Sequence, residues 1–212
     1  MIAEAKSKSI PVVAFNIDAD RTASGNLSYI AQDLRAAGAT LGRRARGSIG
    51  KGSKVIITVH DEGVWALEER MAGMKAALMN QDIEWKVVCT GQKPVEGAER
   101  LHKALENFSA TALLGTGNGD TEACGIVAKR MAGSAPYVGG FDLSPGIVEL
   151  IDEGFIDCSI DQQPYAQGFY PVVQLALYLR YGLMPSSLDA GAAVIDRSNV
   201  HAVRELSRRS IR

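Results

Sequence analysis

The sequence predicts an α/β protein built on a doubly wound, parallel β-sheet. Two observations carry this prediction. Short apolar runs rich in β-branched residues recur along the 212-residue chain, and amphipathic helical patterns lie between them. The runs are almost continuously apolar instead of alternating, which is typical of parallel strands whose sheet is covered by helices on both faces.

Six apolar runs are the expected strands. In chain order they are IPVVAF (10–15), KVIITV (54–59), WKVVCT (85–90), TALLGTG (111–117), PYVGGF (136–141) and IDCSI (156–160). Helices are expected where apolar residues recur at helical spacing. Three such stripes are Leu67, Met71, Met74 and Leu78; Ala98, Leu101, Leu105 and Phe108; and Ala123, Ile126, Val127 and Met131. A fourth helix is expected over 165–181, where nearly every turn carries an aromatic or aliphatic residue.

Composition places the chain among ordinary globular proteins, with 46% hydrophobic and 22% charged residues. The formal net charge of -1 gives no electrostatic basis for a nucleic-acid or membrane-surface partner. The three cysteines lie far apart without a CxxC spacing, so no disulfide framework or zinc site is expected. The first fifteen residues lack the apolar run of a signal peptide, and no transmembrane span is expected.

Polar residues follow most of the predicted strands, at the edge where sheets of this kind bind ligands. They are Asn16 and Asp18; His60, Asp61 and Glu62; Asn118 and Asp120; Asp142; and Asp161 and Gln162. Carboxylates and amides suit vicinal hydroxyls, and the neighbouring Phe15, Trp65 and Phe141 are expected to stack on a sugar ring. The pattern favours a polyhydroxylated ligand. The alternative for any single residue is that it caps a helix.

Catalytic signatures are weak. GTGNGD (115–120) follows a strand and opens a helix, but it is not the GxGxxG fingerprint of dinucleotide-binding proteins, and no Walker A, GxSxG or HExxH motif occurs. His60 beside two acidic residues is typical of a solvated loop. The sequence therefore favours a protein that is not an enzyme and needs no cofactor or metal. A Rossmann-type NAD-dependent oxidoreductase remains the alternative.

Five motifs in linked order point to a known family. They are IPVVAFNIDAD (10–20), YIAQD (29–33), ALEERMAGMKAAL (66–78), YVGGFD (137–142) and SIDQQPYAQG (159–168). Together they resemble the type I periplasmic sugar-binding proteins of ABC importers, a ribose-binding-protein-like group that shares its fold with the effector domains of LacI-type repressors. The resemblance implies a periplasmic protein that closes on a monosaccharide or polyol and then docks on a membrane permease. A repressor would need a helix-turn-helix domain upstream, which the sequence does not show.

The resemblance also implies a set of sugar contacts. They are Asn16, Asp18, Arg70, Asn118, Asp142 and Gln162. Asn16 and Asp18 would hold hydroxyls from the first lobe, and Arg70 would bond to the ring or anomeric oxygen from the second. Asn118 is preferred over Asp120 as the contact from the loop at 115–120. Ile17 stands where ribose binders carry an arginine, which argues against ribose itself.

The same resemblance predicts a two-lobed protein in which most of the first lobe is missing. Residues 1–32 and 163–191 would form the truncated first lobe, and residues 33–162 and 192–212 the complete second lobe. The helix over 165–181 would then expose an apolar stripe of Tyr170, Val173, Leu177 and Tyr181. A homodimer through the incomplete lobe, with weak or absent sugar binding, is therefore expected.

Overall fold

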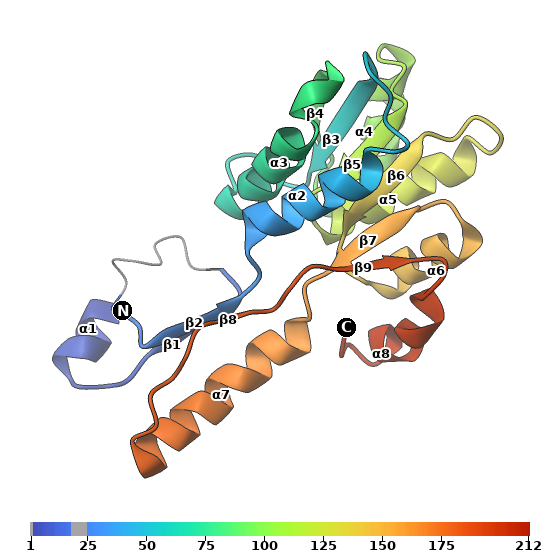
Figure 1. Cartoon of the computed structure of the whole chain (residues 1–212). Helices are drawn as coiled ribbons and strands as arrows, with labels where there is room; N and C mark the ends of the chain where they lie inside the picture. Colours follow the sequence, from blue (N-terminus) through green and yellow to red (C-terminus); the bar gives the residue numbers. More distant parts are fainter. Residues whose placement is uncertain (1, 18–24) are drawn as a thin grey trace. The chain divides into compact units, whose positions relative to one another are not determined.

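The computed structural model describes residues 2–17 and 25–212, which divide into two compact units (Figure 1). The first unit comprises Met1–Asp33, Gln162–Gly191 and Ile211. The second comprises Leu34–Asp161, Ala192–Ser210 and Arg212. The chain thus passes from the first unit into the second and back more than once.

The first unit contains a three-stranded parallel sheet in the order β1-β2-β8. Its elements are α1 (Ile2–Ser7), β1 (Val13–Phe15), β2 (Ser28–Ala31), α7 (Pro164–Tyr181) and β8 (Leu188–Asp189). All four residues of the central strand β2 are buried. Helix α7 packs against β1 and β2, and the Ser28 hydroxyl donates to the Gln174 side-chain oxygen at 2.8 Å. This hydrogen bond fixes the face of α7 that meets the sheet.

The second unit contains a six-stranded sheet in the order β4-β3-β5-β6-β7-β9. Its strands are β3 (Lys54–Val59), β4 (Glu84–Cys89), β5 (Ala112–Gly115), β6 (Tyr137–Phe141), β7 (Cys158–Asp161) and β9 (Ala193–Asp196). All pairs are parallel except β7 with β9, which is antiparallel. The predicted α/β class with a mostly parallel sheet is confirmed.

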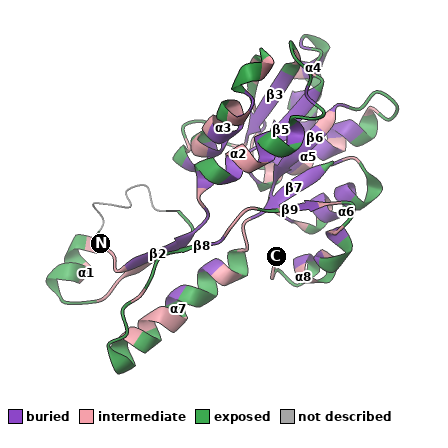
Figure 2. Cartoon of the chain, viewed as in Figure 1, coloured by how far each residue is buried: buried purple, intermediate pink, exposed green. Residues whose placement is uncertain are grey.

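Helices cover both faces of this sheet and enclose two apolar clusters. One cluster lies under α4, α5 and α6 and the C-terminal turns; the other lies under α2 and α3. Figure 2 shows the strands between them as the buried centre of the unit. The bounds are α2 (Leu34–Ala45), α3 (Trp65–Ala77), η1 (Met79–Gln81), α4 (Pro94–Glu106), α5 (Asn118–Arg130), α6 (Pro145–Glu153), η2 (Val200–Ala202) and α8 (Arg204–Arg208).

Strand side chains alternate between the two clusters, as the two-residue period of a strand requires. In β5, Leu113 faces the α4–α5 side, whereas Ala112 and Leu114 face the α2–α3 side. Both sets are fully buried. This two-sided burial explains why the sequence shows continuous apolar runs without alternation.

Helices α2 and α3 approach each other backbone to backbone. A Cβ atom built on Gly38 would clash with the carbonyl oxygen of Arg70, and one built on Gly73 would clash with the carbonyl oxygen of Arg35. Only a residue without a side chain fits at either position. The pair of glycines therefore sets the distance between the helices, and with it the position of Arg70 on α3.

Candidate functional site

The candidate site lies at the carboxyl ends of the parallel strands of the second unit. His60 follows β3, the turn at 116–118 follows β5, and Asp142 follows β6. Parallel strands bring such residues to one edge of a sheet, which is where ligands bind in open α/β folds. Arg70 reaches this edge from α3, because its Nη1 donates to the carbonyl oxygen of Thr116 at 2.8 Å.

Arg70 is an arginine fixed in a buried position. It is 5% exposed, and its guanidinium lies over the ring of Phe141 with Cζ 4.2 Å from the ring centroid. Burial lowers the pKa of Arg70, while the negative charges of Asp142 and then Asp120 act in the opposite direction. Because arginine keeps its proton in proteins, the result is a preorganised cation at the edge of the sheet.

The structure corrects one expectation about aromatic residues. Phe141 was expected to stack on a sugar ring, but it is fully buried and its ring carries the guanidinium of Arg70. Phe141 therefore supports Arg70 through a cation–π contact and presents no face to a ligand. Trp65 and Phe15 are exposed, and their stacking role stays a prediction.

Asp120 closes the first turn of α5 and is fully buried. Its Oδ2 accepts hydrogen bonds from the backbone N–H of Thr116 at 2.6 Å, from the backbone N–H of Gly117 at 3.2 Å and from the Thr58 hydroxyl at 3.2 Å. Asp120 is the third residue of α5, and its bond back to the N–H of Gly117, the residue before the helix, is that of a capping box. Asn118, the first residue of α5, is exposed instead. The burial difference supports the preference for Asn118 as the ligand contact.

Asp142 adopts a backbone conformation that is uncommon outside glycine. Its φ is 72°, its N–H donates to the carbonyl oxygen of Ile160 at 3.0 Å, and its own carbonyl oxygen accepts from the Ser159 hydroxyl at 2.6 Å. These bonds to β7 hold the strained residue in place. Left-handed non-glycine residues concentrate at functional sites, and Asp142 is half-buried at the strand ends.

The remaining predicted residues belong to the first unit or lie outside the described residues. Asn16 is exposed after β1 with a φ of 64°, and its carbonyl oxygen accepts from the Tyr29 hydroxyl at 3.3 Å. Gln162 is half-buried, and its carbonyl oxygen accepts from the Gln167 side-chain nitrogen at 2.5 Å. Asp18 lies outside the described residues.

His60 lies in the loop after β3, as expected, but its ring is not surrounded by solvent. The ring is partly buried, and its Nδ1 lies 3.3 Å from Oδ1 of Asp120. The hydrogen bond to Asp120 is the main reason that the pKa of His60 is raised, with the charges of Asp120, Asp61 and Asp142 adding to it and burial opposing it. Sixty residues separate the partners in sequence, so no local signal links them.

This pair predicts a pH-dependent stability. Because the folded-state pKa of His60 lies above its ordinary value of about 6.5, the stabilisation is fully present below that pH and is lost as the pH rises through the folded pKa. His60→Gln should therefore cost more free energy of unfolding at about pH 5 than at about pH 9, by less than about 1 kcal/mol because the ring is partly exposed. Denaturant unfolding at both pH values measures this. The exposed His201→Gln is the control, and a pH-independent cost for His60→Gln would contradict the prediction.

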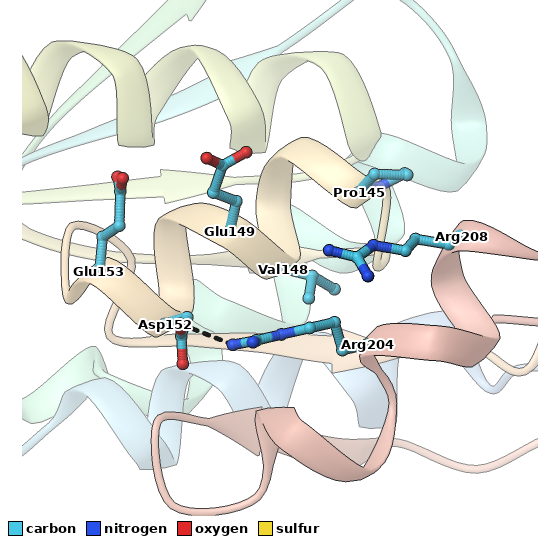
Figure 3. A pocket seen from close by; sticks show the side chains of 7 residues that line it. All are labelled: Pro145, Val148, Glu149, Asp152, Glu153, Arg204 and Arg208. Atoms are coloured by element: carbon cyan, nitrogen blue, oxygen red, sulfur yellow. Dashed lines mark ion pairs between the residues drawn. The ribbon is translucent and has the colours of Figure 1, made fainter.

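A separate surface cleft of about 320 Å³ lies between α6 and α8 (Figure 3). Asp152 of α6 pairs with Arg204 of α8 at an N–O distance of 2.6 Å, and Glu149, Glu153 and Arg208 also line the cleft. None of the predicted site residues lines this cleft.

Among residues 2–17 and 25–212, no group of three or more His, Cys, Asp or Glu side chains is arranged to hold a metal ion. Within the same residues, no helix has the length and apolar character to cross a membrane.

Comparison with known proteins places the fold and its motifs in a family. Residues 1–183 match the model of the periplasmic binding protein domain. The chain is 30% identical over 219 residues to the xylose/arabinose-binding protein XylF of Sulfolobus acidocaldarius, an alignment that covers 93% of this chain and 53% of the relative. The chain therefore spans about half the length of this curated relative.

Solved structures of sugar-binding transport proteins are also similar to this chain. A carbohydrate transporter from Acidothermus cellulolyticus 11B in complex with myo-inositol is 29% identical with a TM-score of 0.85, covering 100% of this chain and 74% of that one. GanP, a glucose-galactose binding protein from Geobacillus stearothermophilus, is 25% identical with a TM-score of 0.81, covering 93% and 71%. The motifs, the doubly wound sheet and these matches agree, and the chain belongs to the periplasmic binding protein domain family.

Proposed function

We propose that this chain is a solute-binding component of an ABC sugar importer and binds a monosaccharide or a cyclic polyol. One observation carries the proposal: the strand ends of the second unit hold a fixed guanidinium, a half-buried carboxylate and an exposed amide, supplied by Arg70, Asp142 and Asn118. These groups offer both donors and acceptors, as vicinal hydroxyls require. The names of the relatives, which mention xylose, arabinose and myo-inositol, support the same ligand class.

In this proposal Asn16 and Asp18 add contacts from the other lobe, and Gln162, at the lobe boundary, adds an amide from the hinge. The lobes are those predicted, residues 1–32 with 163–191 and residues 33–162 with 192–212. Ligand bound to both lobes favours a closed form by its differential affinity, and the closed form docks on a permease in the membrane. The protein acts in the periplasm, and no covalent bond is made or broken.

Titration calorimetry tests the proposal. The full chain is titrated with myo-inositol, D-xylose, L-arabinose, D-glucose and D-galactose, with NADH as the probe for the rival oxidoreductase. Saturable binding of one or more sugars without NADH binding supports the proposal. A folded sample that binds NADH, or that binds none of the sugars, contradicts it.

A substitution at Asp142 can test the role of its carboxylate in binding without straining the backbone. Asp142→Gly removes the carboxylate but fits the left-handed φ without strain, so the fold should keep its stability. Affinity for the bound sugar should fall by about 1–3 kcal/mol, because the hydroxyls lose their acceptor. Asp82→Gly is the matched control, since Asp82 is exposed after η1 with a φ of 51°. Calorimetry showing unchanged affinity for Asp142→Gly would remove Asp142 from the site.

Helix α7 supports a further part of the proposal, association of two copies through the first unit. The predicted stripe is partly exposed, with Tyr170 at 41% and Tyr181 at 69%, and a second row is exposed as well. This second row is Tyr165, Phe169, Val172 and Leu179. Seven of these eight side chains are at least 36% exposed, so α7 presents a broad apolar surface of the kind that marks interaction sites. A second copy of this chain is therefore the proposed occupant.

Sedimentation at micromolar concentration tests this association. Dimers are expected for the unmodified chain, and Val172→Lys with Leu179→Lys should shift it toward monomer. Val95→Lys is the control, because Val95 is an equally exposed apolar residue on α4 of the second unit. A monomeric unmodified chain overturns the proposed dimer, whatever the sugar titrations show.

A further inference from the structure

We propose that Asp120 is a positioning residue for the sugar site, holding one peptide group to which Arg70 is bonded. The inference rests on the proposed function. It adds to the residues that contact ligand a residue that positions them. The peptide group joins Thr116 to Gly117. Its carbonyl oxygen accepts from Nη1 of Arg70 at 2.8 Å, and its N–H donates to Oδ2 of Asp120 at 3.2 Å.

This arrangement places a single peptide dipole between a buried cation and a buried carboxylate. In a trans peptide the oxygen and the N–H hydrogen point in opposite directions, so the two charges act on opposite ends of the dipole. Each hydrogen bond polarises the group and strengthens the other, an effect that is larger in a low-dielectric interior. The carboxylate thereby strengthens the bond that fixes the guanidinium.

The carboxylate of Asp120 is itself held by three residues, from β3, from the loop after β3 and from the turn after β5. The Thr58 hydroxyl on β3 donates to Oδ2, the N–H of Thr116 donates to the same oxygen at 2.6 Å, and the ring of His60 lies against Oδ1. The side chain of Asp120 has no exposed surface. A rigid, fully buried anion behind the turn at 116–118 is what positions both Arg70 and the adjacent Asn118.

Charge balance adds a second argument. Transferring the guanidinium of Arg70 out of water is costly unless opposite charge is near, and Asp142 and Asp120 are the two carboxylates that favour its charged form. Asp142 is proposed to contact ligand, whereas Asp120 has no exposed surface, so Asp120 compensates Arg70 in the same way with or without a bound sugar. The charged and titratable groups that interact with the carboxylate of Asp120 are Arg70 on α3, His60 after β3 and Cys124 on α5. Asp61 and Asp142 in the neighbouring loops act in turn on His60.

Asp120→Asn removes the negative charge of residue 120 and keeps the size of its side chain, so it tests the effect of the charge alone. Asparagine has the same size and keeps one side-chain oxygen, so the turn at the start of α5 can keep a hydrogen-bond acceptor while the charge is lost. In the ligand-free chain, NMR should show faster solvent exchange of the Arg70 side-chain N–H groups by about tenfold or more, and a lower pKa for His60. For a sugar that the unmodified chain binds, with myo-inositol as the first probe, affinity should fall by about tenfold or more.

The controls keep the inference falsifiable. Thr58→Val removes one donor to the carboxylate of Asp120. It should speed the exchange of the Arg70 side-chain N–H groups and lower the sugar affinity, each by a smaller factor, and Thr58→Ser should restore both. If Asp120→Asn does not fold, the two Thr58 variants decide whether Asp120 positions Arg70. A purely structural cap predicts unchanged Arg70 exchange and unchanged affinity in folded Asp120→Asn, and that result overturns the inference. If the unmodified chain binds no sugar, the proposed function fails, and the exchange measurement still decides whether Asp120 fixes Arg70.

Discussion

Gly73→Ala is expected to lower the free energy of unfolding of the second unit by about 3 kcal/mol or more. A methyl group at this position clashes with the backbone carbonyl of Arg35 and lies 2.8 Å from the backbone nitrogen of Ala39. Backbone atoms of a packed helix cannot rotate away as a side chain can. The α2–α3 pair must therefore separate, which opens the apolar cluster beneath it. Helix propensity alone predicts the opposite sign, because alanine stabilises a helix interior by about 1 kcal/mol relative to glycine.

Denaturant unfolding followed by tryptophan fluorescence measures this effect, since Trp65 and Trp85 both belong to the second unit. Gly168→Ala in α7 of the first unit is the control for the effect of helix propensity, and its unfolding is followed by far-UV circular dichroism because both tryptophans lie in the second unit. No atom lies within 4 Å of the Cβ position of Gly168, so this substitution should leave stability unchanged or raise it. Gly38→Ala should resemble Gly73→Ala, because Gly38 meets the backbone of Arg70 in the same helix pair. A cost below about 1 kcal/mol for both variants would show that the helices are not in backbone contact.

The central strands and helices of the second unit could be predicted from the sequence, because strands buried on both faces are continuous apolar runs. KVIITV was predicted as a strand and is β3, and the helix predicted from Leu67 to Leu78 is α3, at Trp65–Ala77. Three strands had no such signal. β8 (Leu188–Asp189) has only two residues, and both are exposed. β2 (Ser28–Ala31) is only four residues long and includes a serine, and β9 pairs antiparallel at a sheet edge with two half-buried residues. Short or edge strands carry too few apolar residues to stand out.

The part of the candidate site that could be predicted is the part that follows from one rule, that ligands bind beyond the carboxyl ends of parallel strands. That rule, with the family motifs, selected Asn118 and Asp142, and the structure places both at the same edge of the sheet. It gave no information on how the edge is supported. Pairing of Thr58 and His60 with Asp120 depends on strand order, and burial of Phe141 under Arg70 depends on how α3 crosses the sheet. Such contacts between distant parts of the chain leave no local pattern in one sequence.

Arg70→Met is expected to reduce affinity for any sugar that the unmodified chain binds by about 100-fold or more, because a buried, preorganised charged donor is lost. Stability should fall as well, by about 3–5 kcal/mol, because methionine removes a cation that compensates the buried carboxylate of Asp120 and the donor to the carbonyl oxygen of Thr116. Calorimetry measures the loss of binding, and denaturant unfolding at the same temperature shows that the variant is folded in the titrated sample.

Two further variants show which property of Arg70 matters. Arg70→Lys keeps the charge but loses the planar fork that bonds to Thr116 and lies over Phe141, so affinity should fall by about tenfold or more. Arg35→Met is the control, because Arg35 is an exposed arginine paired with Glu69 at 3.1 Å, and such surface pairs contribute less than about 1 kcal/mol. If Arg70→Met bound sugar within about threefold of the unmodified chain, the guanidinium would be a structural group that bridges α3 to the sheet, and recognition would depend on Asp142 and Asn118 alone.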